Sequence, residues 1–442
     1  MVFYNLEDIE NDSAIHPIKQ DISSPDCTSN RDTGDKVPRD KETLGQLFRD
    51  YGECYIRTYR PRLDQIKLIR SIRICGTPYL GSTKYTCKKC GASHQVYLHC
   101  GNSHCMLCQA YKRLKWQAGL SARLLNVPYT HTTFTLPKSL RSLAKVNQKV
   151  VYGILFQSAW DCIKKIGEEI GAELGMIGVL HTWGSDLKYH VHIHCLITFG
   201  GLDKNNEWVW PKSKRRLCRY RKINSIYRES FLARLSKAMH NGSIAYHRSY
   251  EEIEEELLSK QWVVNNGWPS KNTEVIESYL AKYINRSAVT AKRISYNSSA
   301  GMVSITHKDY ANKASNGQVG YKKRKLPALV AIAKIMQHKL PSSFHRVRYY
   351  GIHHPSKYKK IHPKIALILK RNKTSIQILF SLLNKLVKGQ KVGKTCGHCG
   401  GEDFEKEKIA GEANWIYENV VDYAQNKSPP TSLNRNVYGN KN

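Results

Sequence analysis

The sequence predicts an α+β protein, in which an antiparallel sheet flanked by helices is preceded by a small cysteine-rich module and followed by a basic helical region. Three features support this prediction. β-favouring runs alternate with long amphipathic helical runs, five cysteines cluster between Cys87 and Cys108, and Lys and Arg occur 20 times between Asp309 and Glu402 without one carboxylate. The side-chain periods of two and 3.6 residues distinguish the strands from the helices.

Composition restricts the class of protein. The chain has 442 residues, of which 41% are hydrophobic, so it can bury a sizeable core in about two to four domains. Its formal net charge is +34, from 70 basic and 36 acidic residues. An excess of this size indicates a polyanionic partner, and nucleic acid is the usual one.

Several classes of protein are disfavoured. No run approaches the roughly 18 apolar residues that a membrane helix needs, and the first residues do not form a signal peptide. We therefore expect a soluble intracellular protein without a membrane partner. The phosphate-binding pattern Gly-x-x-x-x-Gly-Lys-Ser/Thr is absent, which argues against a nucleotide cofactor. The 13 cysteines, an odd number, favour metal binding over a disulfide framework.

The chain begins with an acidic segment. Residues 1–50 contain 11 acidic and six basic residues, and residues 1–40 are polar enough to be a disordered tail. Helical periodicity then covers residues 42–60 and 63–74.

Two Cys-x-x-Cys pairs, Cys87–Cys90 and Cys105–Cys108, follow with 14 residues between them. Each pair can turn tightly and direct two thiolates at one tetrahedral ion, which is typical of a structural Zn²⁺ site. These four cysteines are the first choice of ligands, and a different set or a second ion could use the spare donors Cys75, His94, Cys100 and His104. Residues 41–126 are thus predicted to be a helical and zinc-binding domain, ending in a basic helix over 112–125.

Residues 127–350 are predicted to form the central α+β domain. Strand-like runs cover 129–136, 176–183 and 190–199, and the last is expected to end at the turn signal Gly200–Gly201. Helical periodicity covers 138–171 with a break, and then 219–239, 251–262 and 326–340. Residues 292–325 alternate like a meander, and residues 344–350 are expected to form a basic strand.

The run His190-Val-His-Ile-His194 has the clearest chemical pattern. On a strand its three imidazoles would line one face, and Val191, Ile193 and Cys195 would line the other. A single histidine would more often be a half-buried sheet residue, but three at alternate positions favour a divalent metal site. His181 on the neighbouring strand could reach the same ion, and His131 is a weaker candidate.

Tyr279 and Tyr283 are four residues apart, so on a helix they would share one face. With the neighbouring apolar residues they could simply form a core stripe. A metal site in the same domain favours a chemical role, because a tyrosine can attack a phosphodiester while a divalent cation neutralises the shifting charge.

Residues 351–442 are predicted to be a basic helical region with helices over 361–371 and 374–389 and a disordered tail. It contains one more pair, Cys396–Cys399. This pair could be half of a second zinc knuckle or two free thiols, since no partner pair follows it.

Six motifs occur in order along residues 60–350. They are HCGNSHCMLCQ (99–109), FTLP (134–137), LHTWG (180–184), HVHIHCL (190–196), YLAKY (279–283) and RVRYYG (346–351). Together they resemble the two-tyrosine HUH rolling-circle transposases of bacterial insertion sequences.

The resemblance implies an HUH nuclease core with an RRM-like antiparallel sheet, cutting one DNA strand through a 5′-phosphotyrosine. It places the HUH pair on His192 and His194, with His181 and His190 as further metal candidates, and the catalytic tyrosines on Tyr279 and Tyr283. It implies Mg²⁺ or Mn²⁺ as the catalytic cofactor beside structural Zn²⁺, and single-stranded DNA at the element's ends and target site as the substrate. The third metal ligand stays open, because the family often has His where this chain has Asn285.

We expect DNA contacts from ten basic residues, which are Lys112, Arg113, Lys115, Arg286, Lys322, Lys323, Arg324, Lys325, Arg346 and Arg348. The implied location is the bacterial cytoplasm, beside the nucleoid. Alternatives are a replication initiator or relaxase of the same chemistry, a hydrolase using metal-activated water, and a non-catalytic zinc-ribbon DNA-binding regulator, which would leave the histidine strand idle.

Overall fold

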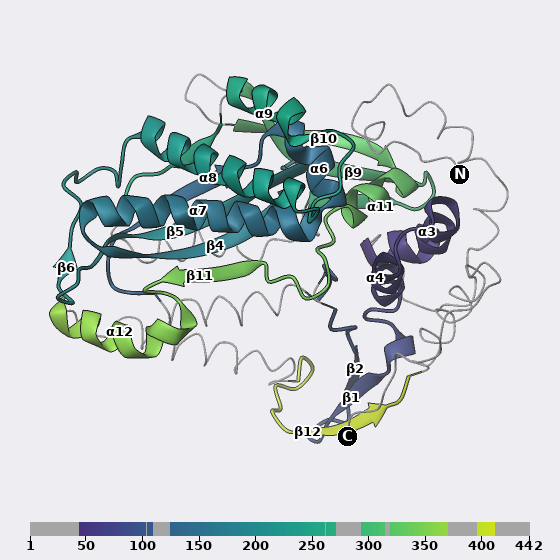
Figure 1. The fold of residues 1–442 in the computed structure, drawn as a ribbon. Coiled ribbons are helices and arrows are strands. Elements are labelled where there is room, and N and C mark those ends of the chain that lie inside the picture. The colour runs from purple at the N-terminus through teal and green to yellow at the C-terminus, as the bar shows by residue number, and fades with distance from the viewer. Residues whose placement is uncertain are drawn as a thin grey trace, which may run out of the picture.

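The computed structural model describes residues 44–102, 104–108, 124–260, 262–270, 293–313, 319–369 and 396–411. These residues form helices and three antiparallel sheets, which confirms the predicted α+β class (Figure 1). No helix among them has the length and apolar character that crossing a membrane requires.

The largest sheet has six strands in the order β11-β4-β5-β3-β7, with β6 paired to β5. Every pairing in it is antiparallel. The strands are β3 (Tyr129–Thr135), β4 (Glu173–Trp183), β5 (Tyr189–Leu202), β6 (Trp208–Val209), β7 (Val264–Asn266) and β11 (Val347–Gly351). β4 and β5, which contain the predicted runs 176–183 and 190–199, form an antiparallel hairpin at the centre of this sheet.

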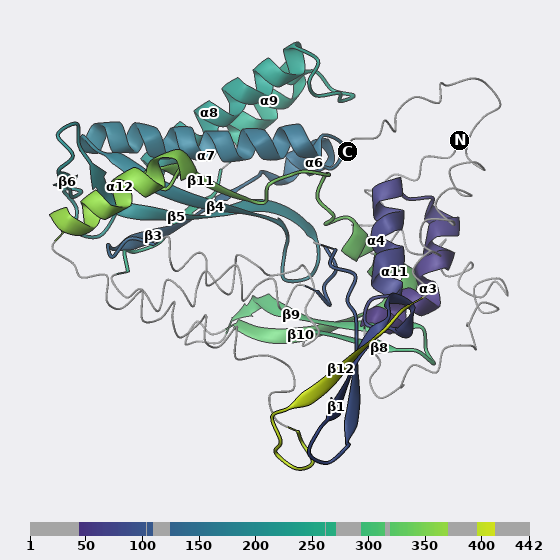
Figure 2. The same ribbon diagram turned by 90° about the horizontal axis from the view of Figure 1, so that it is seen from below.

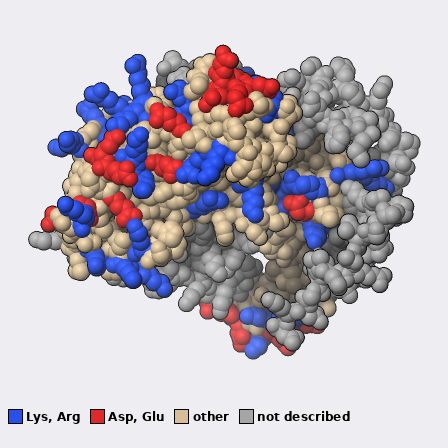
Figure 3. All heavy atoms as spheres, viewed as in Figure 1, with Lys and Arg blue, Asp and Glu red and all other residues tan. Residues whose placement is uncertain are grey.

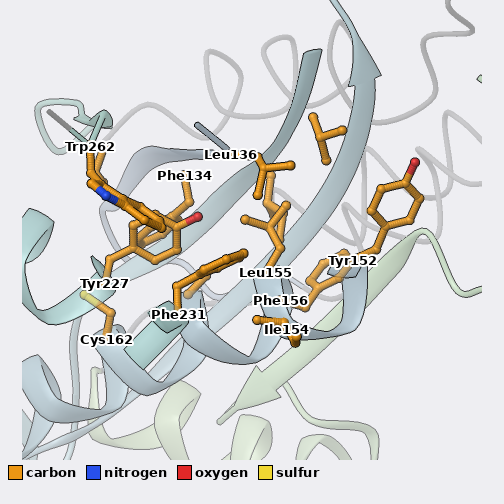
Figure 4. Packing of buried hydrophobic residues seen from close by; sticks show 14 of the residues in the cluster. Phe134, Leu136, Tyr152, Ile154, Leu155, Phe156, Cys162, Tyr227, Phe231 and Trp262 are labelled. Carbon is orange, nitrogen blue, oxygen red and sulfur yellow. The ribbon is translucent and has the colours of Figure 1, made fainter. Parts of the chain in front are cut away.

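Two long helices, α7 (Gln148–Ile170) and α8 (Tyr220–His240), cover one face of this sheet (Figure 2). The predicted break lies at Asn147, between α6 (Arg141–Val146) and α7. The short helix η3 (Lys138–Leu140) precedes α6, and α9 (Tyr250–Ser259) follows α8. The core beneath them includes Phe134, Phe156, Phe231 and Trp262 (Figure 4). This core includes Val191, Ile193 and Cys195. The apolar side chains of the histidine strand therefore face the core, as predicted.

The opposite face of the sheet has a smaller apolar cluster. Ile177, Val179 and Leu196 pack there with Ile365 of α12 (Pro355–Ile368). The hairpin of β9 (Met302–Lys313) and β10 (Val319–Pro327) lies on the side of the sheet away from α7 (Figure 2).

A second core joins segments that are far apart in the sequence. Helices α3 (Leu44–Tyr59) and α4 (Leu63–Arg73) pack with α11 (Ala328–Met336) and with the meander of β8 (Ile294–Asn297), β9 and β10. The Tyr296 hydroxyl donates to Asp50 Oδ2 at 2.6 Å, and Lys339 Nζ donates to Asp64 Oδ2 at 2.7 Å. Parts of the predicted 41–126 and 127–350 domains therefore share one core.

The third sheet has the order β12-β1-β2, after the short helix η2 (Pro78–Leu80). It combines β1 (Ser82–Cys87) and β2 (Ser93–Tyr97) with β12 (Phe404–Ile409), which comes from the predicted carboxyl-terminal region. Residues 396–411 thus return to the amino-terminal module.

The predicted end of the histidine strand at Gly200–Gly201 is wrong, because β5 continues to Leu202. The glycines let two backbones approach: a Cβ on Gly201 would lie 2.2 Å from the Glu173 carbonyl oxygen of β4. Elsewhere α12 begins earlier than the predicted helix over 361–371, and β11 is shorter than the predicted strand over 344–350. The predicted helices over 112–125 and 374–389 lie mostly or wholly outside the described residues.

Gly153 lies inside α7, and nothing would lie within 4 Å of a Cβ added to it. Glycine in a helix interior costs about 0.5–1 kcal/mol relative to alanine. We expect Gly153→Ala to raise the free energy of unfolding by about this amount, measured by urea denaturation. A lower midpoint would show that the space beside α7 is not open.

Candidate functional site

Three histidines from the two central strands converge on the sheet face away from α7. One ring nitrogen each from His181, His192 and His194 lies within 4.8 Å of the others. His181 of β4 pairs with His192 of β5 in the strand register, and His194 follows two residues later on the same face. The alternation of the strand therefore brings the three imidazoles together.

The hydrogen bonds of His192 and His194 orient their rings. His192 Nδ1 lies 2.9 Å from the carbonyl oxygen of His190, and His194 Nδ1 lies 3.0 Å from His131 Nε2. The Nε2 atoms of His192 and His194 lie 3.1 Å apart. Two nitrogens bound at about 2.1 Å to one ion at a right angle would be about 3.0 Å apart, so this arrangement fits a shared metal.

Burial keeps these rings neutral. It lowers the pKa of His192 to about 3 and that of His131 to about 4, and it also lowers the pKa of His194. Neutral imidazole is the form that binds metal ions. His192 and His194 therefore do not have to lose protons near neutral pH before they can hold a cation.

The fourth predicted metal residue, His190, is not part of this cluster. Its Nδ1 lies 3.2 Å from Arg141 Nη2, although its backbone carbonyl orients His192. His131, the weaker candidate, contacts His194 from β3 and so lies beside the cluster.

A stack of side chains adjoins His181. The ring of Trp183 stacks on the His181 ring with centroids 4.7 Å apart, and the guanidinium carbon of Arg346 lies 4.7 Å from the Trp183 centroid. Arg346 Nε also donates to the Leu180 carbonyl oxygen at 3.0 Å. Arg346 thus places a cation beside the histidines. Sequence reasoning missed Trp183, which its position two residues after His181 on the same strand face could have indicated.

The other predicted DNA-binding residues divide into three groups. Lys322, Lys323 and Lys325 are exposed on β10 and Arg324 is half-buried, and Lys322 pairs with Asp309 at 2.8 Å. Arg348 instead lies over the ring of Phe156, 4.6 Å from its centroid, on the α7 side of the sheet. The remaining residues, with both predicted catalytic tyrosines, lie outside the described part of the chain: Lys112, Arg113, Lys115, Tyr279, Tyr283 and Arg286.

The face that carries α7 and α8 mixes both signs of charge, and acidic residues gather over α9 (Figure 3). This face therefore does not offer a continuous cationic track to a nucleic acid. The exposed lysines of β10 lie on the other side of the sheet, where the histidines converge (Figure 2).

The predicted zinc set of Cys87, Cys90, Cys105 and Cys108 is wrong as a single site, because the structure divides its two pairs between two clusters. The first cluster joins Cys105 and Cys108 to Cys100 and Cys75, all within 4.8 Å. Its Cys75–Cys108 and Cys100–Cys108 sulfur distances are 3.5 and 3.6 Å. The second cluster joins Cys87 and Cys90 to Cys396 and Cys399. The 14 residues between the predicted pairs contain β2, which separates them.

Two family profiles match this chain. Residues 47–136 match a transposase zinc-binding domain, and residues 175–360 match a family described as "Putative transposase". "Putative transposase y4qJ" of Sinorhizobium fredii is 30% identical over 332 residues, which cover 71% of this chain and 81% of that protein. The chain belongs to the two-tyrosine insertion-sequence transposase family.

A second relative of this transposase agrees with the assignment. The transposase for insertion sequence element IS801, from Pseudomonas savastanoi pv. phaseolicola, is 25% identical over 65% of this chain and 70% of its own length. No solved structure matches the transposase. The zinc-binding profile covers the whole first cysteine cluster, which supports a structural Zn²⁺ there. The three histidines lie within the other profile.

Proposed function

We propose that this transposase nicks and rejoins single-stranded DNA through a 5′-phosphotyrosine, in rolling-circle transposition of an insertion sequence. The observation that carries this proposal is the cluster of His181, His192 and His194 on the sheet face opposite the α7–α8 core. Three converging imidazoles, of which His192 and His194 are kept neutral by burial, suit a divalent cation, and a structural role would not require their ring nitrogens to converge. The expected setting is the bacterial cytoplasm.

We assign the nucleophiles to Tyr279 and Tyr283, because the resemblance to two-tyrosine transposases places the catalytic tyrosines there. A tyrosine oxygen attacks the phosphorus and loses its proton to solvent, the bond from phosphorus to the 3′ oxygen breaks, and the strand leaves with a free 3′ hydroxyl. Attack by a 3′ hydroxyl on the phosphotyrosine reverses the step and joins two strands without a nucleotide cofactor. Bound Mg²⁺ or Mn²⁺ would neutralise charge on the phosphate as a Lewis acid.

The described residues contribute binding and orientation. His131 and the His190 carbonyl fix the rings of His194 and His192, so the metal-facing nitrogens need little rearrangement. Burial lowers the pKa of Arg346 to about 10, which leaves this guanidinium charged beside the site. Together with the exposed lysines of β10, it would attract a single strand toward the histidines.

The test is covalent capture on an oligonucleotide. The full-length protein is incubated with Mn²⁺ and a single-stranded oligonucleotide spanning the end of its element, and the products are separated under denaturing conditions. We expect a protein–DNA adduct for the wild type and for Tyr220→Phe, which alters a tyrosine on α8 that is 37% exposed. Tyr279→Phe combined with Tyr283→Phe should form none. If this double variant and the wild type form the adduct equally, the nucleophiles are assigned wrongly; if neither forms it, the proposal fails.

A further inference from the structure

The second cysteine cluster lies outside the chemistry proposed above. The Cys87 and Cys399 sulfurs are 3.6 Å apart, as are those of Cys90 and Cys396, and all four lie within 4.8 Å of one another. The two family matches end at residues 136 and 360, so neither reaches Cys396 or Cys399.

The two Cys-x-x-Cys pairs have the same backbone structure. In each pair a glycine with positive φ follows the second cysteine: Gly91 at 70° and Gly400 at 68°. Each of these glycines donates its N–H to the first cysteine's carbonyl oxygen at 2.8 Å. The N–H of the first cysteine donates to the carbonyl oxygen of the residue after the glycine. Cys87 donates to Ala92 at 2.9 Å, and Cys396 donates to Gly401 at 2.7 Å. Two like turns therefore face each other and direct four sulfurs at one point.

The spacing of the sulfurs fits a tetrahedral ion. A Zn–S bond of about 2.3 Å requires sulfurs about 3.8 Å apart at the corners of a tetrahedron. The two 3.6 Å distances are close to this value and far beyond the roughly 2.05 Å of a disulfide. Four cysteine sulfurs without another ligand type are the donor set of a closed structural site.

Contacts around the cluster position the carboxyl-terminal pair. β12 pairs with all of β1, from Ser82 opposite Ile409 to Cys87 opposite Phe404, and Lys88 N–H donates to the Asp403 carbonyl at 3.0 Å. A Cβ on Gly401 would lie 3.2 Å from the Cys87 sulfur, so this glycine leaves room for the sulfurs to approach.

We propose that Cys87, Cys90, Cys396 and Cys399 bind a second structural Zn²⁺, which fastens the β12 segment to the β1–β2 hairpin. Because Cys90 and Cys396 are 306 positions apart in the sequence, the ion closes a long loop that includes the whole central sheet. The free energy of metal binding then holds β12 in place. The carboxyl-terminal pair is thus the missing half of a knuckle whose first half lies in the zinc-binding domain.

Zinc stoichiometry of the full-length protein tests this proposal. By native mass spectrometry and elemental analysis, we expect two zinc ions per wild-type chain and one in the Cys396→Ser/Cys399→Ser variant. Cys218→Ser, which alters a cysteine outside both clusters, should keep two. One zinc in the wild type, two in the double variant, or iron in place of zinc would overturn the proposal.

Thiol protection in the wild type tests the same site without a variant that could misfold. Cys90 is exposed and Cys399 half-buried, so a free thiol at either position should react readily with iodoacetamide. We expect both to resist alkylation in the zinc-loaded protein and to react at least about tenfold faster after chelation, while Cys218 reacts at the same rate in both states. Equal rates at Cys90 and Cys399 with and without zinc would contradict the proposal. Loss of the tyrosine adduct would leave this result unaffected.

Discussion

Replacing His192 and His194 together with alanine is expected to reduce strand nicking at least about 1,000-fold, equivalent to about 4 kcal/mol of transition-state stabilisation. The two Nε2 atoms are 3.1 Å apart, and His181 completes the three-nitrogen cluster. With both rings removed, one imidazole remains, which is too few ligands to retain a divalent cation near the reacting phosphate. Nicking of a labelled oligonucleotide over a Mn²⁺ titration measures both the rate and the metal dependence.

His190→Ala provides a matched comparison on the same strand face. This side chain contacts Arg141, and His192 is oriented by the backbone carbonyl of residue 190, which the substitution keeps. We expect it to change the nicking rate less than about tenfold, with the Mn²⁺ dependence retained. If His192→Ala/His194→Ala nicked DNA at the wild-type rate, or if His190→Ala were equally inactive, the assignment of the metal site would be wrong.

The alternation of polar and apolar residues along the sequence was sufficient to predict the two strands that carry the histidine cluster. The alternation from His190 to Cys195 predicted which side chains face the core and which lie on the opposite face, because a strand that buries one face has its register fixed by that face. The same reasoning placed His181 beside the cluster, since a short turn must return the chain antiparallel.

The local sequence pattern was insufficient to predict contacts between segments that are far apart in the chain. Cys87 and Cys90 pair with Cys396 and Cys399, and β12 joins β1, but no periodicity in either segment indicates that partner. The spacing of two Cys-x-x-Cys pairs made a single site the simplest interpretation, whereas Cys75, just after α4, and Cys100 complete the first cluster in place of Cys87 and Cys90. Gly200 and Gly201 were misread for a related reason. A glycine that permits the close approach of a neighbouring strand has the same local sequence signal as one that ends a strand.

Gly351→Ala is expected to destabilise the central sheet by about 4 kcal/mol or more. Gly351 ends β11 with φ of 58°, a left-handed conformation that costs a residue with a Cβ about 1–2 kcal/mol. An added Cβ would also lie 1.9 Å from the Leu174 carbonyl oxygen and 2.8 Å from Cη2 of Trp160. The first of these atoms belongs to the backbone of β4, which cannot move without disturbing the strand that bears His181.

Gly153→Ala, the same chemical change in an open position of α7, separates this steric effect from the general effect of removing a glycine. The urea concentration at the denaturation midpoint should therefore be lower than that of the wild type for Gly351→Ala and higher for Gly153→Ala. Because β11 follows Arg346, partial loss of β11 should also remove the cation that lies over Trp183, and the intrinsic fluorescence of the protein should change along with stability. A Gly351→Ala protein as stable as the wild type would show that β11 is not held against β4 in the way the strand register requires.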